Sequence, residues 1–245
     1  MSSNAPKQDT EICNDDIDQH VYNAIVDAIL NRQLKPGTRL IEAPLCKAFG
    51  VTRGVLRRVF VRLAHDKVIE IQPNRGALIA TYSLEETKEI FEARSMLEIE
   101  TVKKLARKAR CIDLNPLRHL VNQEAEVRKS GYWKEWIKLS GEFHIRLSEV
   151  NQNSIVTNYL QTLIARTSLL IGMYEIPKHN NCSVEEHKAI LDAIEKGDDK
   201  LATSLMEEHL EDYANILMDE HPQTNNVNLT DIFNNLDFQV KNSKK

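Results

Sequence analysis

The stretch VTRGVLRRVFVRLAHDKVIEIQPNRGALIATY, residues 51–82, decides the fold class of this chain. Thr52 can cap a helix over residues 53–66, which carries apolar side chains at helical spacing. The pattern then changes to two short apolar, β-rich runs, 68–71 and 77–81, with turn-forming residues between them. A helix followed directly by a two-stranded β-hairpin is therefore predicted here.

Two more helices are predicted before this stretch. The first begins near residues 15–16, where an Asp can cap it, and ends before the Pro-Gly turn at residues 36–37. A short second helix fits residues 43–49, because Gly50 is a typical residue just beyond a helix end. Three helices and a hairpin are the components of a winged helix-turn-helix domain, which we place at residues 15–82.

The charge of this segment differs from that of the rest of the chain. Residues 21–82 carry ten Lys and Arg but only four Asp and Glu, which gives the segment a net charge of +6. The whole chain has a net charge of −4, so the remainder carries −10. A basic module joined to an acidic body indicates an anionic partner for the module alone.

The arginines of the 53–66 helix are placed for DNA recognition. Arg53 and Arg57 lie one turn apart on one face, and an Arg side chain can form two hydrogen bonds with guanine in the major groove. Arg58 and Arg62 lie on an adjacent face and suit phosphate contacts. The alternative, an ordinary solvated face, is disfavoured by their position at the start of a helix and ahead of a wing. The hairpin tip adds three candidates for the minor groove or the backbone: Asn74, Arg75 and Gly76.

Residues 21–82 resemble the winged helix-turn-helix domain of the GntR family of transcription regulators. The matching residues are Leu34-Lys35-Pro36-Gly37-Thr38-Arg39-Leu40, Glu42, Leu45, Phe49-Gly50-Val51-Thr52-Arg53, Leu56-Arg57, Arg62-Leu63 and Pro73-Asn74-Arg75-Gly76-Ala77. The resemblance implies that Arg53 and Arg57 contact bases, and that Gly54 and Gly76 approach the DNA. The family usually has Glu at the position of Arg58, so this chain loses a negative charge there and gains a candidate phosphate contact.

The composition of the 245-residue chain limits its class. It is 42 % hydrophobic and 28 % charged, with only 8 Gly and 7 Pro, which favours a helical globular protein over an all-β or disordered one. Its four cysteines form no C-x-x-C pair, which excludes a zinc ribbon and a disulfide scaffold. No apolar run reaches the ~18 residues of a membrane span, and residues 1–14 predict a polar, disordered tail without a signal peptide. We therefore expect a cytoplasmic protein with no membrane partner.

From Ser83 onward the sequence predicts helices. Ser83-Leu84-Glu85-Glu86 is a capping box at the start of a long helix. Five further helices fit residues 113–129, 132–150, 153–173, 183–196 and 198–218. Their short connections predict an all-helical antiparallel bundle over residues 83–218, so the fold class is mainly α with a small hairpin. Residues 219–245 form a polar C-terminal tail, in which a short helical piece near 229–237 is a candidate for docking.

Three histidines lie on three different predicted helices of this bundle. His144, His187 and His209 each neighbour apolar core positions. Imidazoles that converge inside a bundle can hold a divalent metal and leave open positions for water or a ligand. The alternative for each is a histidine that is simply hydrogen-bonded on its helix. Spacing along the chain does not decide whether the three converge.

Residues 84–218 are similar to the helical effector domain of the FadR subfamily, called FCD. The matching residues are Glu89-Ile90-Phe91-Glu92-Ala93-Arg94, Leu97-Glu98, Phe143-His144, Asn153, Glu186-His187, Ala193-Ile194, Gly197-Asp198, Ala202, Met206 and His209-Leu210. The resemblance implies one divalent metal ion, such as zinc, nickel or manganese, bound by one Asp and three His. His144, His187 and His209 match the histidines, but Ser140 stands where the family has the Asp. The site can therefore be weak, completed differently, or a metal-free set of hydrogen-bonding histidines.

The same resemblance implies a binding site for a small metabolite. Arg94 matches an arginine that the family often directs at an effector carboxylate, and such a contact can be bidentate. An ion pair with Glu98 on the same helix is the alternative for Arg94. The full set of candidate effector-binding residues is Arg94, Ser140, His144, Arg166, Tyr174, His187 and His209.

These features predict a ligand-responsive transcription regulator. We expect a homodimer on a palindromic double-stranded DNA operator, acting as a repressor that a small metabolite relieves. An architectural DNA-binding protein without an effector is one alternative. A helical metal-dependent hydrolase is the other, and it is disfavoured because no general base lies beside the histidines; we expect no enzymatic activity.

Overall fold

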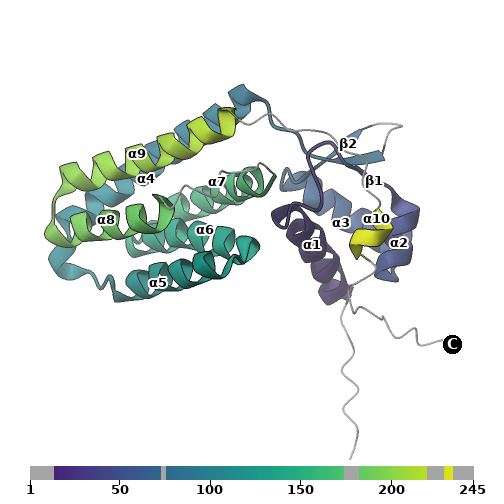
Figure 1. Cartoon of the computed structure of the whole chain (residues 1–245), viewed down its shortest axis with the longest axis horizontal. Helices are drawn as coiled ribbons and strands as arrows, with labels where there is room; N and C mark the ends of the chain where they lie inside the picture. The colour runs from purple at the N-terminus through teal and green to yellow at the C-terminus, as the bar shows by residue number, and fades with distance from the viewer. Residues whose placement is uncertain (1–13, 73–75, 174–181, 220–228, 234–245) are drawn as a thin grey trace, which may run out of the picture.

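The computed structural model describes residues 14–72, 76–173, 182–219 and 229–233, and it has two parts (Figure 1). The N-terminal part contains α1 (Asn14–Leu30), β1 (Arg39–Leu40), α2 (Glu42–Phe49), α3 (Arg53–His65), β2 (Ile69–Gln72) and β3 (Gly76–Ile79). The C-terminal part contains α4 (Leu84–Arg107), a 3-10 turn η1 (Ala109–Cys111), α5 (Asn115–Ser130), α6 (Trp133–Val150), α7 (Ser154–Met173), α8 (Cys182–Lys196) and α9 (Asp199–Asp219). A short helix, α10 (Leu229–Phe233), follows. The predicted fold class, mainly α with a winged helix-turn-helix and a helical bundle, is confirmed.

The helix-turn-helix owes its shape to residues at the junction of α2 and α3. Gly50 ends α2 with a φ of 64°, in the left-handed region that favours glycine. Thr52 caps α3, because its side chain accepts a hydrogen bond from the Val55 backbone N–H. The apolar face of α3 then packs into a shared core through fully buried side chains such as Leu56 and Leu63. The two helices are thus fixed with the opposite face of α3 exposed.

The wing is a three-stranded antiparallel sheet with the strand order β1-β3-β2. β2 and β3 form the predicted hairpin, with Ile69 opposite Ile79 and Gln72 opposite Gly76. β1 is an additional strand that the sequence did not predict, in which Arg39 pairs with Leu78 and Leu40 with Ala77. Two residues are too short to show an alternating pattern, so only the tertiary structure reveals this strand.

The C-terminal part is a helical bundle. Ser83 caps its first helix, because the Ser83 hydroxyl accepts a hydrogen bond from the Glu86 backbone N–H at 3.0 Å. α4 packs along α9, α6 packs against both α5 and α7, and α8 packs against α5 and α9. This arrangement places α4, α6, α8 and α9 around one interior. No helix within the described ranges is long and apolar enough to cross a membrane.

Helix α1 lies between the two parts and contacts both. It packs on α3 in its own domain and on α6 and α7 of the bundle. The Asp27 carboxylate binds the ammonium groups of Lys134 and Lys138, at 3.2 and 2.8 Å. At the C-terminal end of α7, a Cβ on Gly172 would lie 3.0 Å from the Leu30 Cα, so only glycine allows this approach. The N-terminal part is therefore packed directly on the bundle.

Candidate metal centre and nucleic-acid interface

The structure brings His144, His187 and His209 together inside the bundle. They come from α6, α8 and α9, and each is at most 4 % exposed. One ring nitrogen from each lies within 4.8 Å of the other two, and the Nε2 atoms of His144 and His209 are 3.3 Å apart. The three imidazoles can therefore share one ligand at their centre.

Each of these histidines has a carboxylate partner on its Nδ1 atom. His144 pairs with Glu98 of α4 at 2.5 Å, His187 with Glu124 of α5 at 2.8 Å, and His209 with Glu186 of α8 at 2.6 Å. A carboxylate accepts the Nδ1 proton and so leaves the Nε2 lone pair free to bind a metal. Sequence reasoning missed the roles of Glu124 and Glu186, since the separations along the chain, 63 and 23 residues, carry no signal.

Burial favours the neutral form of two of these imidazoles, His144 and His209. Burial lowers the pKa of His144 to about 3, and burial also lowers the pKa of His209. Burial alone would raise the pKa of Glu98, but the adjacent Arg94 guanidinium holds that pKa below its usual range. His144 and His209 thus present neutral nitrogen donors, the form that binds metal ions.

A small cavity of about 20 Å³ adjoins His144 and His209. Its lining includes Arg94, Ser140 and Thr167 together with these two histidines. That volume holds about one water molecule, so this form of the protein has room for an ion or a water but not for a larger metabolite. Ser140 therefore lies where the sequence comparison with the family placed it, beside the histidine cluster.

Arg94 forms the ion pair with Glu98 that the sequence offered as the alternative to an effector contact. Its Nε donates to the Glu98 carboxylate at 2.7 Å, and its Nη1 donates to the Thr167 hydroxyl at 3.0 Å. Its Nη2 is buried and has no hydrogen-bond partner among the described residues, and the same is true of His187 Nε2. A buried N–H group without a partner is costly, and a ligand carboxylate would satisfy it.

Another candidate effector residue, Arg166, lies elsewhere. The Arg166 guanidinium donates to the Glu86 carboxylate at 2.6 Å and lies over the Tyr82 ring, and it does not line the cavity. Because Tyr82 precedes α4 and Glu86 belongs to it, Arg166 ties α7 to the junction between the two parts. Tyr174 lies outside the described residues.

On the exposed face of α3, Arg53 and Arg57 extend into solvent. The Arg57 side chain is 66 % exposed and forms two hydrogen bonds with the Glu42 carboxylate, at 2.8 and 3.2 Å. Arg57 in turn lowers the pKa of Glu42 through these bonds, so Glu42 stays ionised and holds the guanidinium over α2. Gly54 lies between them, and an added Cβ there would meet nothing closer than 3.7 Å.

Arg58 and Arg62 lie on the adjacent face of α3, as predicted, but they bind α1. Arg58 forms two hydrogen bonds with the Asp18 carboxylate, at 2.8 and 2.9 Å. Arg62 donates to the Gln19 side chain at 2.7 Å and lies over the Tyr22 ring. In the absence of DNA these arginines hold α3 against α1, and contact with phosphates requires their side chains to leave or share these partners.

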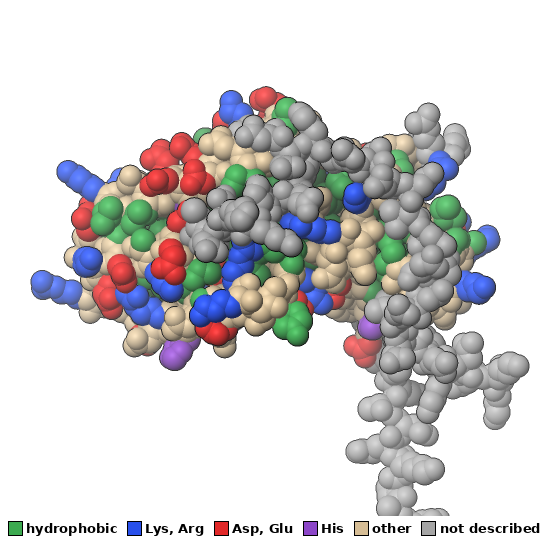
Figure 2. Space-filling view, viewed as in Figure 1, with side chains coloured by type: hydrophobic (Ala, Val, Ile, Leu, Met, Phe, Trp, Pro, Cys, Tyr) green, Lys and Arg blue, Asp and Glu red, His purple; other side chains and the backbone are tan. Residues whose placement is uncertain are grey.

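At the wing, Gly76 opens β3 with a φ of 87°, which only glycine adopts without strain. Asn74 and Arg75 lie outside the described residues. Figure 2 shows Lys and Arg side chains at the right-hand end, over the N-terminal part, whereas acidic side chains gather above the bundle. This distribution agrees with the opposite net charges of the two segments.

Comparison with known proteins matches both parts of the chain. The family described as "Bacterial regulatory proteins, gntR family" matches residues 17–79, and the FCD domain family matches residues 89–212. Similar proteins include the HTH-type transcriptional repressor RspR of Escherichia coli strain K12, 21 % identical over 81 % of this chain and 87 % of RspR. The HTH-type transcriptional regulator LutR of Bacillus subtilis is 24 % identical over 77 % of this chain and 95 % of LutR.

Solved structures show the same fold. A putative GntR transcriptional regulator from Rhodococcus sp. RHA1 has a TM-score of 0.73 with 21 % identity, covering 82 % of this chain and 97 % of the other. E. coli McbR/YncC has a TM-score of 0.68 with 19 % identity, covering 83 % and 97 %. These likenesses extend over both parts of the molecule.

Proposed function

We propose that a small carboxylic acid controls this chain, which belongs to the gntR family of bacterial regulatory proteins and carries an FCD domain. Members of this family are transcriptional regulators, so the chain is a transcriptional regulator and not an enzyme. We further propose that the acid binds beside a divalent metal held by His144, His187 and His209. The observation that carries the proposal is the convergence of three buried imidazoles in one centre, beside the buried Arg94 Nη2 that has no hydrogen-bond partner among the described residues. Neither group has an evident use in a purely architectural DNA-binding protein.

The donor set suits particular metals. Imidazole nitrogens bind zinc and nickel well, whereas manganese prefers carboxylate oxygens, and Ser140 supplies no carboxylate here. Zinc or nickel is therefore favoured over manganese. The metal would supply a positive charge for the carboxylate of the effector. Arg94 Nη2 would orient that carboxylate by a charge-assisted hydrogen bond.

Two helices connect this centre with the DNA-binding part. α6 carries Ser140 and His144 at the cavity and Lys134 and Lys138 against Asp27 of α1. α7 carries Thr167 at the cavity and Gly172 against Leu30. The 20 Å³ cavity must enlarge to admit a metabolite, so binding has to move α4, α6, α7 or α9. A shift of α6 or α7 would change the position of α1 and so select among orientations of the DNA-binding part.

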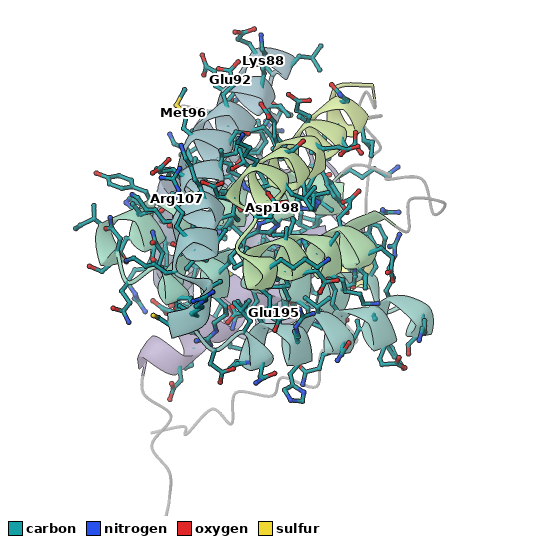
Figure 3. The ribbon with its side chains drawn as sticks, turned by 90° about the vertical axis from the view of Figure 1, so that its left-hand side faces the viewer. Lys88, Glu92, Met96, Arg107, Glu195 and Asp198 are labelled. Carbon is teal, nitrogen blue, oxygen red and sulfur yellow. The ribbon has the colours of Figure 1, made fainter. Side chains whose placement is uncertain are left out.

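We propose that the regulator acts as a homodimer on a palindromic operator and that the effector relieves repression. A groove of about 600 Å³ runs between α4 and α9 on the outer face of the bundle. Figure 3 shows Lys88, Glu92 and Met96 along that face of α4, and Met96 is 74 % exposed. An apolar groove with a charged rim suits contact with a second copy. Repression is supported by the name of RspR, a repressor that is similar to this chain.

The experiment that tests the proposal screens small mono- and dicarboxylic acids against the zinc-loaded full-length chain by thermal unfolding. An acid that raises the melting temperature is then added to a duplex selected by the protein from a random pool, and DNA affinity is read by fluorescence anisotropy. We expect the acid to weaken DNA binding. Arg94→Lys, which keeps the charge beside Glu98 but loses the planar fork, should abolish the response. The matched variant Arg107→Lys, whose arginine pairs with Asp199 on the surface, should retain it.

The proposal fails if no acid stabilises the zinc-loaded chain, or if Arg94→Lys responds like the parent protein. An acid that strengthens DNA binding would keep the site but reverse the assignment as a repressor.

A further inference from the structure

The short helix α10 packs on the DNA-binding part, although it follows the last helix of the bundle in the chain. In Figure 1 it lies beside α2. Leu229 and Phe233 are 5 % and 1 % exposed, and Ile232 packs against the same core. The Phe233 ring lies 4.8 Å from the ring of Phe49, which ends α2 and is fully buried. The contact is therefore apolar and closely packed.

Because of this contact, the two parts are joined along the chain at a second place. The family matches end at residue 212, and α9 ends at Asp219, so α10 belongs to a C-terminal extension beyond both family domains. The first connection is the chain between β3 and α4. The second begins at α9, the helix that carries His209, and ends on α2.

The position of α10 excludes a simple blocking role. Arg53, Arg57 and Val61, on the outer face of α3, remain exposed with α10 in place. A segment that hid the recognition helix from DNA would cover these side chains. The contact with α2 instead affects the orientation of the DNA-binding part relative to the bundle.

We propose that α10 is a clasp: it binds the α2 face of the DNA-binding part through Leu229, Ile232 and Phe233 and restricts the orientation of that part relative to the bundle. The chain runs from α9 to α10, and α10 contacts α2 of the same molecule. The clasp therefore supplements the contacts of α1 with α6 and α7. This inference does not depend on a metal, an effector or an operator.

The test measures the distance between the two parts by pulsed electron spin resonance in the full-length chain. Nitroxide labels are placed at His65→Cys on α3 and Gln123→Cys on α5, both exposed, with the four native cysteines replaced by Ser. The labelled chain is diluted with an excess of unlabelled chain, so each distance lies within one molecule. Three tail variants are compared with the parent: Phe233→Ala, a deletion of residues 220–245, and a control deletion of residues 236–245 that keeps α10.

We expect one narrow distance distribution for the parent and for the 236–245 deletion. The 220–245 deletion and Phe233→Ala should both give a broad distance distribution instead. Circular dichroism should show that both proteins keep their helical content. A narrow distribution in all four proteins would overturn the clasp, even if the melting temperature falls, because α10 would then only complete the core of the DNA-binding part. If Phe233→Ala fails to fold, the two deletions still test the clasp, because only the 220–245 deletion should broaden the distance distribution.

Discussion

Three histidines inside the bundle each pair their Nδ1 atom with a carboxylate, and one ring nitrogen from each lies close to the other two. This arrangement fixes the tautomer and the ring orientation that a metal site needs. It also explains how a site without the usual Asp can still be ordered. Arg94 belongs to the same network through Glu98, so the side chain that we propose for binding an acid also contributes to the charge of the network.

The buried histidines predict a pH-dependent stability of the metal-free chain. The pKa of His144 in the folded protein, about 3, lies below its ordinary value of 6.5, and the pKa of His209 is lowered too. The unfolded chain therefore takes up protons first as the pH falls. Stability is complete above pH ~6.5 and is lost as the pH falls from there toward 3. Urea denaturation at several pH values measures this loss.

The control for this prediction is a histidine outside the cluster. His144→Gln should reduce the slope of stability against pH, whereas His119→Gln, at an exposed position, should leave the slope unchanged. Equal slopes in both variants would show that the buried histidines do not govern the acid response.

Arg57 carries the prediction for sequence recognition. Arg57→Ala should cost about 1–3 kcal/mol in binding to the selected duplex and relax the preference at one base position. Arg107→Ala is the matched control, because Arg107 is similarly exposed, pairs with one acid and lies on the bundle. Fluorescence anisotropy with selected and random duplexes measures both. An equal loss of affinity for both duplexes would assign Arg57 to the phosphates.

Among the helices and strands, α3 is the one whose first turn places the side chains proposed to contact DNA. Thr52 caps the helix, and Arg53 and Arg57 follow on the exposed face. Arg58 and Arg62 tie the other side of α3 to α1, so this helix is held from two directions. These contacts hold α3 in position without DNA, and a preformed recognition helix loses less entropy on binding.

The cap gives a prediction for this element. Thr52→Ala should lower the free energy of unfolding by about 1 kcal/mol, because the Val55 N–H loses its acceptor. Thr52→Ser keeps the hydroxyl and should restore most of the loss. Urea denaturation followed by circular dichroism compares the two. If Ser and Ala behave alike, the cap contributes through something other than its hydroxyl.

Long periodic segments and their caps could be predicted from the sequence, and shorter or distant features could not. The Ser83 capping box, the α3 stripe and the hairpin all depend on neighbours within a few residues. β1 has only two residues and was not predicted. α10 has five residues, all of which lie within the predicted piece 229–237. Whether α10 docks depends on Phe49, 184 positions earlier than Phe233, and no local pattern reports that contact.

The candidate site followed the same rule. The sequence and the family resemblance identified the three histidines, Arg94 and Ser140, which the structure places around one buried centre. Glu124 and Glu186 were missed as histidine partners, since an acidic residue on a helix is usually solvated. The attachment of Arg58 and Arg62 to α1 was missed as well, because Asp18 and Gln19 lie 40 or more residues away.

At the scale of the whole molecule, α1 is the part through which the bundle positions the DNA-binding domain. It touches α6 at Asp27 and α7 at Leu30. The Arg32 guanidinium, just beyond α1, also lies over the Trp133 ring at the start of α6, 4.4 Å from its centroid. A movement of α6 or α7 at the cavity would therefore act directly on α1.

Gly172 predicts how tightly the two parts are joined. Gly172→Ala places a Cβ 2.9 Å from the Leu30 Cδ2 and 3.0 Å from its Cα, so α1 and α7 must separate. The substitution should cost about 1–3 kcal/mol of stability, as overpacking does. Gly54→Ala, with open space around it, is the control and should not destabilise the fold. Thermal unfolding of both variants measures the difference, and an equal effect would mean that α1 and α7 are loosely packed.

We propose that the histidine cluster is a metal-dependent sensor, and calorimetric titration of zinc into the metal-free full-length chain tests this proposal. We expect about one zinc per chain, loss of that binding in His209→Ala, and tighter binding in Ser140→Asp, which supplies the missing carboxylate. Absence of binding in the parent chain, or unchanged binding in His209→Ala, would contradict it.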